Sequence, residues 1–186
     1  MWQYTGRLYN ISRVRIAAVS LYSLEKLISE TRRIARDYRH ATGKSLGGVS
    51  GEIAHFDACK ALNLEPVPHG TEGGYDAVGN GDREGKKIQI KARAIFDEGK
   101  SGQRIGQLKL EQDWDSVVLV LMDENFEPFE MYELEREQIE ADQQENQSKR
   151  SKRGAMSVAK FKAIGALVWT REFGEEDDVW DNQSGS

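Results

Sequence analysis

Three polar side chains in the middle of the chain are spaced so that a single β-hairpin would bring them together. Residues 75–79 (YDAVG) and 87–93 (KIQIKAR) flank a turn rich in glycine, asparagine and aspartate. If the two segments pair, Asp76 lies opposite Gln89 with Cβ atoms about 5 Å apart, and Lys91 follows on the same face. A carboxylate, an amide oxygen and an ammonium group at one strand edge are suited to metal-assisted hydrolysis of a phosphodiester.

The second of these segments alternates between apolar and polar residues, which is typical of a strand with one buried face. One face holds Ile88, Ile90, Ala92 and Ala94, and the other holds Lys87, Gln89, Lys91 and Arg93. A turn that closes between Gly79 and Lys86 gives the pairing described above. Alternation alone also fits an ordinary strand with a solvated polar face, so the assignment depends on the surrounding elements.

Two helices are predicted before the hairpin. Apolar residues at helical spacing predict the first over residues 20–40 and the second over residues 50–62. Pro66 and Pro68 prevent the second helix from continuing. Residues 69–74 then form a loop that leads into the hairpin.

The chain after the hairpin predicts mainly strands. Residues 96–106 are glycine-rich and indicate a loop, and residues 108–114 indicate a short helix or an irregular turn. The continuous aliphatic run 116–122 (SVVLVLM) is typical of a strand covered on both faces, and 129–132 predicts its neighbour. The remaining expectations are a helix over 134–139, an exposed polar loop over 142–155, a helix over 157–163 and a strand over 166–169.

This order of elements predicts one α/β domain over residues 1–170, with a mixed central sheet flanked by helices. We expect an N-terminal helical part over about residues 1–48, a core over about 49–170, and an acidic, disordered tail over 171–186. No run of about 18 apolar residues exists, so no membrane partner is expected. The single cysteine, Cys59, excludes an internal disulfide framework and fits a reducing, cytoplasmic location.

Charge is strongly segregated along the chain, although the net charge is only −5. Residues 1–50 hold nine Lys/Arg against three acids, whereas residues 111–146 hold thirteen acids and one base. Because phosphate responds to a local basic surface, the acidic total does not exclude a nucleic-acid partner. The same runs also fit solvated faces, and the arginines late in 20–40 fit the dipole of the helix.

The hairpin with Asp76 and Gln89-Ile90-Lys91 resembles the active-site hairpin of the PD-(D/E)xK nucleases, the restriction-endonuclease-like superfamily. Glu52, early in the second predicted helix, matches a glutamate that is common on the preceding helix in that superfamily. The resemblance covers about residues 50–132 and includes the covered strand that follows the hairpin.

The chain departs from the superfamily pattern at two positions. Tyr75 stands where a proline is frequent, and Gln89 stands where the second acid is usual. The resemblance is therefore closest to the Mrr-like D…QxK variant. Since a glutamine offers a neutral oxygen, such a site would hold Mg²⁺ more weakly than a site with two carboxylates.

The resemblance implies a restriction-endonuclease-like three-layer core and a Mg²⁺-dependent DNA endonuclease, with Mn²⁺ as a substitute metal. It implies that Asp76, Gln89 and Glu52 bind the metal, together with the carbonyl oxygen of Ile90. Lys91 would orient the attacking water and offset charge that develops on the phosphate. The implied catalytic residues are thus Glu52, Asp76, Gln89 and Lys91.

The expected partners are DNA and a second copy of the chain. Arg93 lies on the polar strand face and is expected to contact phosphate, and a second set of expected contacts is the basic cluster Lys149, Arg150, Lys152 and Arg153. A homodimer is expected because cutting both strands takes two active sites. By analogy, the protein would serve restriction, phage defence or DNA repair. The alternatives are a junction resolvase or nickase with the same site, and an inactive nucleic-acid-binding module of the same fold.

Overall fold

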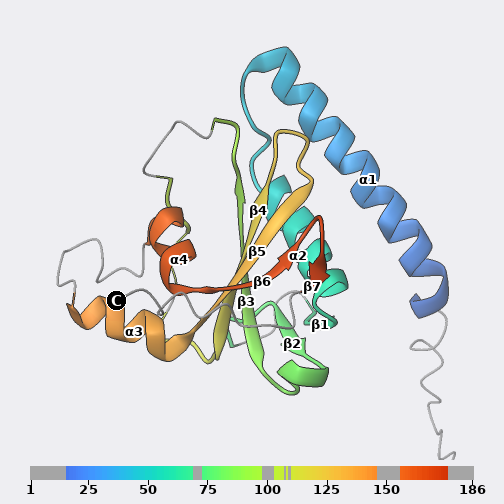
Figure 1. Ribbon diagram of the computed structural model, residues 1–186. Coiled ribbons are helices and arrows are strands. Elements are labelled where there is room, and N and C mark those ends of the chain that lie inside the picture. The colour runs from blue at the N-terminus through green and yellow to red at the C-terminus, as the bar shows by residue number, and fades with distance from the viewer. Residues whose placement is uncertain are drawn as a thin grey trace, which may run out of the picture.

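The structure is a computed structural model that describes residues 16–68, 73–97, 103–106, 108, 110–145 and 156–175. Figure 1 shows its helices and strands. The helices are α1 (Ile16–Thr42), α2 (Val49–Ala61), the 3₁₀-helix η1 (Gly81–Arg83), α3 (Arg136–Glu145) and α4 (Val158–Ile164). The strands are β1 (Leu64–Pro66), β2 (Ala77–Gly79), β3 (Lys87–Ala94), β4 (Ser116–Met122), β5 (Pro128–Glu135), β6 (Ala166–Thr170) and β7 (Gly174–Glu175).

The seven strands of the described residues form one mixed sheet in which each strand lies beside the next one in the chain. Strands β3 and β4 are parallel, and the other neighbouring strands are antiparallel. A parallel pair requires a crossover connection, which usually contains a helix. Here the described part of the connection between β3 and β4 is irregular, and it buries Ile105, Leu108 and Trp114.

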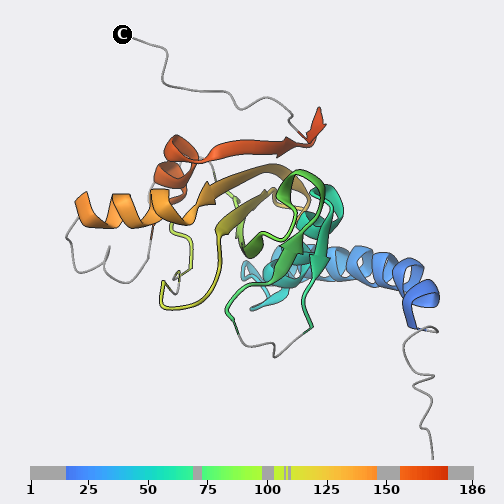
Figure 2. The same ribbon diagram turned by 90° about the horizontal axis from the view of Figure 1, so that it is seen from below.

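Both faces of the sheet are covered, as the aliphatic run of β4 predicts. Val118, Val120 and Met122 belong to a core shared with α1 and α2. Val117, Leu119 and Leu121 point to the other face, and their core includes residues of α3, α4 and the irregular crossover. The fold is therefore a mixed α/β fold with helices on both faces of the sheet (Figure 2).

Most of the predicted elements are confirmed. The first two helices cover the expected ranges, and α1 begins earlier than expected. Strand β4 has the expected bounds, and β5 contains the expected strand 129–132. Helix α4 follows Ser157, whose side chain accepts a hydrogen bond from the Lys160 N–H and caps the helix, and β6 follows as expected.

Three predicted element boundaries are wrong, and one strand was not predicted. The sequence analysis missed β1, which ends in a proline and lies at the edge of the sheet. Residues 134 and 135 belong to β5 rather than to the next helix, and residues 142–145 belong to α3 rather than to a loop. The expected tail is wrong for residues 171–175, because Gly174–Glu175 form β7, which pairs with the end of β6. The remainder of the expected tail, from residue 176, lies outside the described residues.

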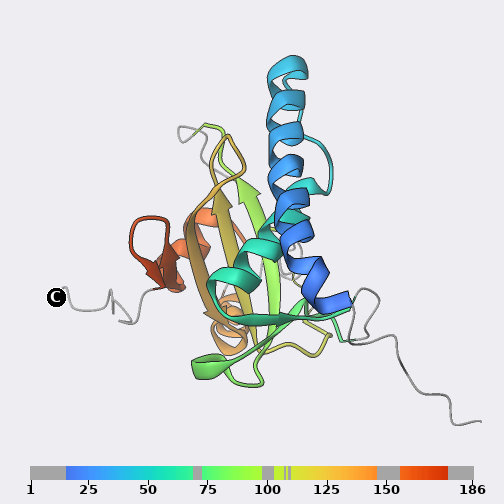
Figure 3. The same ribbon diagram turned by 90° about the vertical axis from the view of Figure 1, so that its right-hand side faces the viewer.

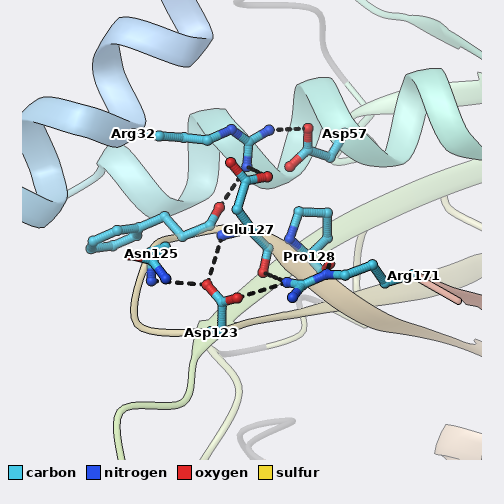
Figure 4. A network of polar contacts seen from close by, with 8 residues as sticks. Arg32, Asp57, Asp123, Asn125, Glu127, Pro128 and Arg171 are labelled. Carbon is cyan, nitrogen blue, oxygen red and sulfur yellow. Dashed lines mark hydrogen bonds and ion pairs between the residues drawn. The ribbon is translucent and has the colours of Figure 1, made fainter.

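Helix α1 runs along the outside of α2 and extends beyond the sheet (Figure 3). Arg32 fixes it in place, because its guanidinium pairs with the buried carboxylate of Asp57 on α2. The same guanidinium donates to the carbonyl oxygen of Phe126 and lies 3.4 Å from the carboxylate of Glu127 (Figure 4). One arginine thus joins α1, α2 and the β4–β5 turn.

None of the helices in the part of the chain that the structure describes combines the length and apolar character needed to span a bilayer.

Candidate active site

Strand β3 presents its polar residues to one side of the sheet. Its apolar residues Ile88, Ile90, Ala92 and Ala94 pack in the core beneath α2. Lys87 lies on the opposite side, with its ammonium 5.7 Å from the centre of the Tyr75 ring, and Tyr75 packs against the second core. Since strand residues alternate between faces, Gln89, Lys91 and Arg93 share the side of Lys87. The alternation expected from the sequence is therefore confirmed.

The β2–β3 hairpin has the expected register in its paired part. The Gly79 N–H donates to the Lys86 carbonyl oxygen at 2.8 Å, and Ala77 lies opposite Ile88. Gly79 is required here, because a Cβ at this position would collide with the backbone of Arg83. Strand β2 begins at Ala77, so Asp76 stands directly before the first paired residue.

Asp76 extends the hydrogen bonding of the hairpin with both its main chain and its side chain. Its N–H donates to the carbonyl oxygen of Ile88 at 2.8 Å, and its carboxylate Oδ2 accepts from the N–H of Ile90 at 2.7 Å. The carboxylate thus takes a position that a main-chain acceptor of β2 would otherwise fill. Beyond this point, no strand among the described residues pairs with β3 on the β2 side.

Gln89 is held from the loop that precedes Asp76. Its side chain is buried, with 2% of its surface exposed, and its Nε2 donates to the carbonyl oxygen of Gly74 at 2.6 Å. Because a carbonyl oxygen can only accept, this bond fixes which end of the amide is the nitrogen. The other end, Oε1, is buried and has no hydrogen-bond partner among the described residues. Leaving such an atom unpaired costs about 1–3 kcal/mol, which a cation or a donor on a ligand would recover.

Gly74 is a residue of the site that the sequence analysis treated only as part of a loop. Its φ of +79° is a conformation that side chains other than glycine adopt rarely, and a Cβ there would collide with the side chain of Gln112. Its carbonyl oxygen orients the amide of Gln89. The neighbouring pair Gly73-Gly74 was the available signal, but the role of a main-chain carbonyl carries no residue-type signature.

Arg93 provides a second unpaired polar atom on the same strand face. Its Nε is buried and has no hydrogen-bond partner in the part of the chain that the structure describes. Lys91 lies between Gln89 and Arg93 on this face and is half-buried. An arginine with such an unpaired donor is suited to bind a phosphate or carboxylate oxygen.

Helix α2 lies beside Asp76 through His55 and Cys59. The Nε2 of His55 is 3.0 Å from the main-chain carbonyl oxygen of Asp76, so this nitrogen carries the hydrogen. Burial, together with the nearby charges of Asp76 and Glu65, raises the pKa of Cys59 to about 12 and keeps it a thiol. Glu52 lies one turn before His55, and its side chain is exposed to solvent.

The structure brings the predicted site residues together only in part. The side chains of Asp76 and Gln89 both form hydrogen bonds that connect residues 74–76 to β3. Among the described residues, no group of three or more His, Cys, Asp or Glu side chains is placed to hold a metal ion. The basic cluster Lys149, Arg150, Lys152 and Arg153 lies outside the described residues.

A magnesium ion here would therefore need at least one ligand that is not an acidic side chain. The donors at this point are the carboxylate of Asp76 and the unpaired amide oxygen of Gln89, and Mg²⁺ binds oxygen ligands while it keeps several waters. The donor set thus fits Mg²⁺ in its chemistry. Comparison of the chain with protein-family models and with curated proteins finds no match.

Proposed function

We propose that the protein is a Mg²⁺-dependent endodeoxyribonuclease with a PD-(D/E)xK-type site on a restriction-endonuclease-like core. The main support is the buried Oε1 of Gln89, an acceptor that the fold orients but does not satisfy. The order of α2, the antiparallel strands β1 to β3 and the covered strand β4 agrees with the resemblance on which the proposal rests.

Each side chain of the site has a role that its surroundings suit. Asp76 and Gln89 contribute oxygen ligands, and Glu52 supplies a further carboxylate, directly or through a water. Lys91 orients the attacking water, and Arg93 holds a phosphate oxygen with the guanidinium whose Nε the fold leaves unpaired. When bound, Mg²⁺ polarises the phosphate and lowers the pKa of a coordinated water.

A second candidate is a nucleic-acid-binding module that has the fold without the activity. One observation favours it, namely that the described residues hold no group of three acidic, histidine or cysteine side chains placed for a metal. Such a module would use Lys91 and Arg93 to contact phosphate and would not cleave.

The test is incubation of the purified protein with supercoiled plasmid in Mg²⁺, Mn²⁺ or EDTA. We expect nicking or linearisation with either metal and none with EDTA. Asp76→Asn keeps an oxygen for the Ile90 N–H, so it should fold and yet lower the cleavage rate by about a hundredfold or more. Asp76→Ala should abolish cutting. The matched control is Asp82→Ala, an exposed acid in η1 of the same hairpin, which should cleave like the unaltered protein.

Binding measured by gel shift separates the two candidates. An endonuclease with Lys91→Ala should lose cleavage while it keeps most of its affinity for duplex DNA. A protein that binds DNA but cleaves in neither metal would support the binding module. Equal cleavage by Asp76→Asn and the unaltered protein would remove the nuclease assignment to this site. Nicked and branched substrates would distinguish a nickase or junction resolvase from a double-strand endonuclease.

A further inference from the structure

Arg136, the first residue of α3, holds one irregular part of the chain, residues 110–115, which end the crossover between β3 and β4. Its main-chain N–H and its guanidinium together donate to four main-chain carbonyl oxygens, those of Leu110, Gln112, Trp114 and Asp115. The guanidinium also lies over the Trp114 ring, 4.9 Å from its centre, and pairs with Glu140 at 2.8 Å. Because a guanidinium carries five donors in a fixed planar arrangement, one arginine can fix the path of such a segment.

The 110–115 segment lies against the loop that contains Gly73 and Gly74. The Asp113 N–H donates to the Gly73 carbonyl oxygen at 2.9 Å. The Gln112 side chain lies directly over Gly74, since a Cβ on this glycine would come within 2.1 Å of the Gln112 Oε1. A shift of the 110–115 segment would therefore move both glycines.

Gly74 passes such a shift on to Gln89. The side-chain Nε2 of Gln89 donates to the Gly74 carbonyl oxygen at 2.6 Å. The Oε1 of the same amide is buried, and none of the described residues donates to it. Since the nitrogen and the oxygen belong to one rigid amide group, the position of Gly74 determines where Oε1 points.

We propose that Arg136 is a positioning residue of the candidate active site, which acts through the 110–115 segment and Gly74 on the Oε1 of Gln89. Among the described residues, none of the hydrogen-bond or ion-pair partners of Arg136 is assigned to the site. The part of this inference that concerns a metal ion rests on the proposed function, whereas the orientation of the amide does not.

Arg171 offers a matched control, because it makes contacts of the same kind in another part of the molecule. Its guanidinium donates to two main-chain carbonyl oxygens beside the β4–β5 turn (Figure 4), those of Glu127 and Pro128. Arg136→Gln and Arg171→Gln thus each remove an arginine that holds main-chain carbonyls together. Only the contacts of Arg136 lie on the path to Gly74.

NMR of the ¹⁵N-labelled full chain without metal measures the orientation of the amide. The side-chain signals of Gln89 are identified by their loss in Gln89→Leu. We expect Arg136→Gln to shift these signals and to speed their hydrogen exchange with water, because the bond to Gly74 is weakened, while Arg171→Gln leaves both unchanged. Gln112→Ala keeps Arg136 but removes the side chain over Gly74, so it should act like Arg136→Gln and replaces that variant if circular dichroism shows it unfolded.

Mn²⁺ binding, followed by the electron paramagnetic resonance of the free ion, separates this inference from the proposed function. Groups that orient a metal ligand typically change metal affinity by about 10–100-fold, so we expect Arg136→Gln to bind Mn²⁺ about tenfold more weakly and Arg171→Gln to bind it like the unaltered protein. An unaltered protein that binds no Mn²⁺ would contradict the proposed function, and the NMR result would then decide the positioning role.

Two results would overturn the inference. The first is that the Gln89 signals are the same in Arg136→Gln, Gln112→Ala and the unaltered protein. The second is that Arg171→Gln changes these signals as much as Arg136→Gln does, since the effect would then follow from a general loss of stability. Equal Mn²⁺ affinity of Arg136→Gln and the unaltered protein would overturn the role of Arg136 toward the metal.

Discussion

The two ends of the Gln89 amide differ: the nitrogen is held by a hydrogen bond, whereas the buried oxygen has no partner among the described residues. Substitutions of Gln89 can therefore test whether this oxygen binds a metal ion. Gln89→Glu replaces the donor to Gly74 by a second oxygen. In the absence of metal, a charge is then buried beside a carbonyl, and we expect a loss of about 1–3 kcal/mol in the free energy of unfolding. Mg²⁺ should recover more stability in this variant than in the unaltered protein, because it binds the folded state.

Thermal unfolding in EDTA and in Mg²⁺ measures this difference. Gln89→Leu is the matched control, since it removes the amide and offers no oxygen. Its melting temperature should respond to Mg²⁺ less than that of the unaltered protein. If Gln89→Glu and Gln89→Leu respond to Mg²⁺ equally, position 89 is not a metal ligand.

At the level of single residues, the sequence predicted which side chains of β3 share a face but not how they are held. Strand alternation follows from backbone geometry, so Gln89, Lys91 and Arg93 could be assigned to one face directly. The bond from Gln89 to the Gly74 carbonyl and the use of the Asp76 carboxylate by the Ile90 N–H depend on the path of a loop. No pattern of residue types encodes that path.

Among the elements, α1 is attached to the domain through few residues, and Arg32 is the central one. Its guanidinium is the charged partner of the Asp57 carboxylate, and the two side chains are only 12% and 10% exposed. Burial raises the pKa of Asp57, and Arg32 opposes that rise. Arg32→Ala leaves this carboxylate buried without its cation, so we expect a loss of about 3–5 kcal/mol.

Urea unfolding checks this value against a surface ion pair on the same helix. The control is Arg36→Ala, whose guanidinium pairs with Asp37 at the exposed surface and should contribute less than about 1 kcal/mol. Equal losses in the two variants would show that the Arg32–Asp57 pair does not anchor α1.

Helical spacing predicted that α1 exists but could not assign its two apolar faces. Leu24 and Leu27 fit the period as well as Ile28 and Ala35 do, yet only the latter pair is turned toward the core. Strand β1 was missed for a related reason. A proline is read as a break, although it is tolerated in an edge strand such as β1.

Across the whole molecule, the segregated charges of the sequence are paired by the fold. Acids of the segment 111–146 meet bases from distant parts of the chain, in the pairs Arg83–Glu133, Lys86–Glu135, Lys162–Glu130 and Arg171–Asp123. Charged surfaces therefore could not be predicted from the charge runs of the sequence, because the pairing of these charges depends on the topology. The mixed α/β class, in contrast, followed from the order of elements, because that order depends on local patterns.

Glu133 makes the stability of the whole molecule depend on pH. Burial alone would raise the pKa of Glu133, but the hydrogen bonds from Arg83 and Ser116 and the charge of Lys86 together lower it from 4.5. A lowered pKa stabilises the folded state above the unfolded value and loses that contribution as the pH falls through the folded value. We therefore expect the free energy of unfolding to decrease below about pH 4.5.

Glu133→Gln should be less stable than the unaltered protein at pH 7, by about 3 kcal/mol, and should lose less stability between pH 5 and pH 3. Denaturant unfolding across this range measures both effects. Glu124→Gln, at an exposed acid in the β4–β5 turn, is the control and should follow the unaltered protein. Parallel curves for Glu133→Gln and the unaltered protein would exclude Glu133 as the titrating group.

Because every strand lies beside its neighbour in the chain, most sheet contacts join residues that are close in sequence, which favours rapid folding. Two closures span more of the chain, namely the crossover from β3 to β4 and the connection from β5 through α3 and α4 to β6. At the first of them, a chain leaving the ribosome must wait for residues 116–122 before β3 gains its parallel neighbour. Until then the newly made β3 has one edge unpaired along its whole length and the other free beyond Asp76. That interval is when the nascent chain is most exposed to strand pairing with other chains, and when a chaperone would do most to protect it.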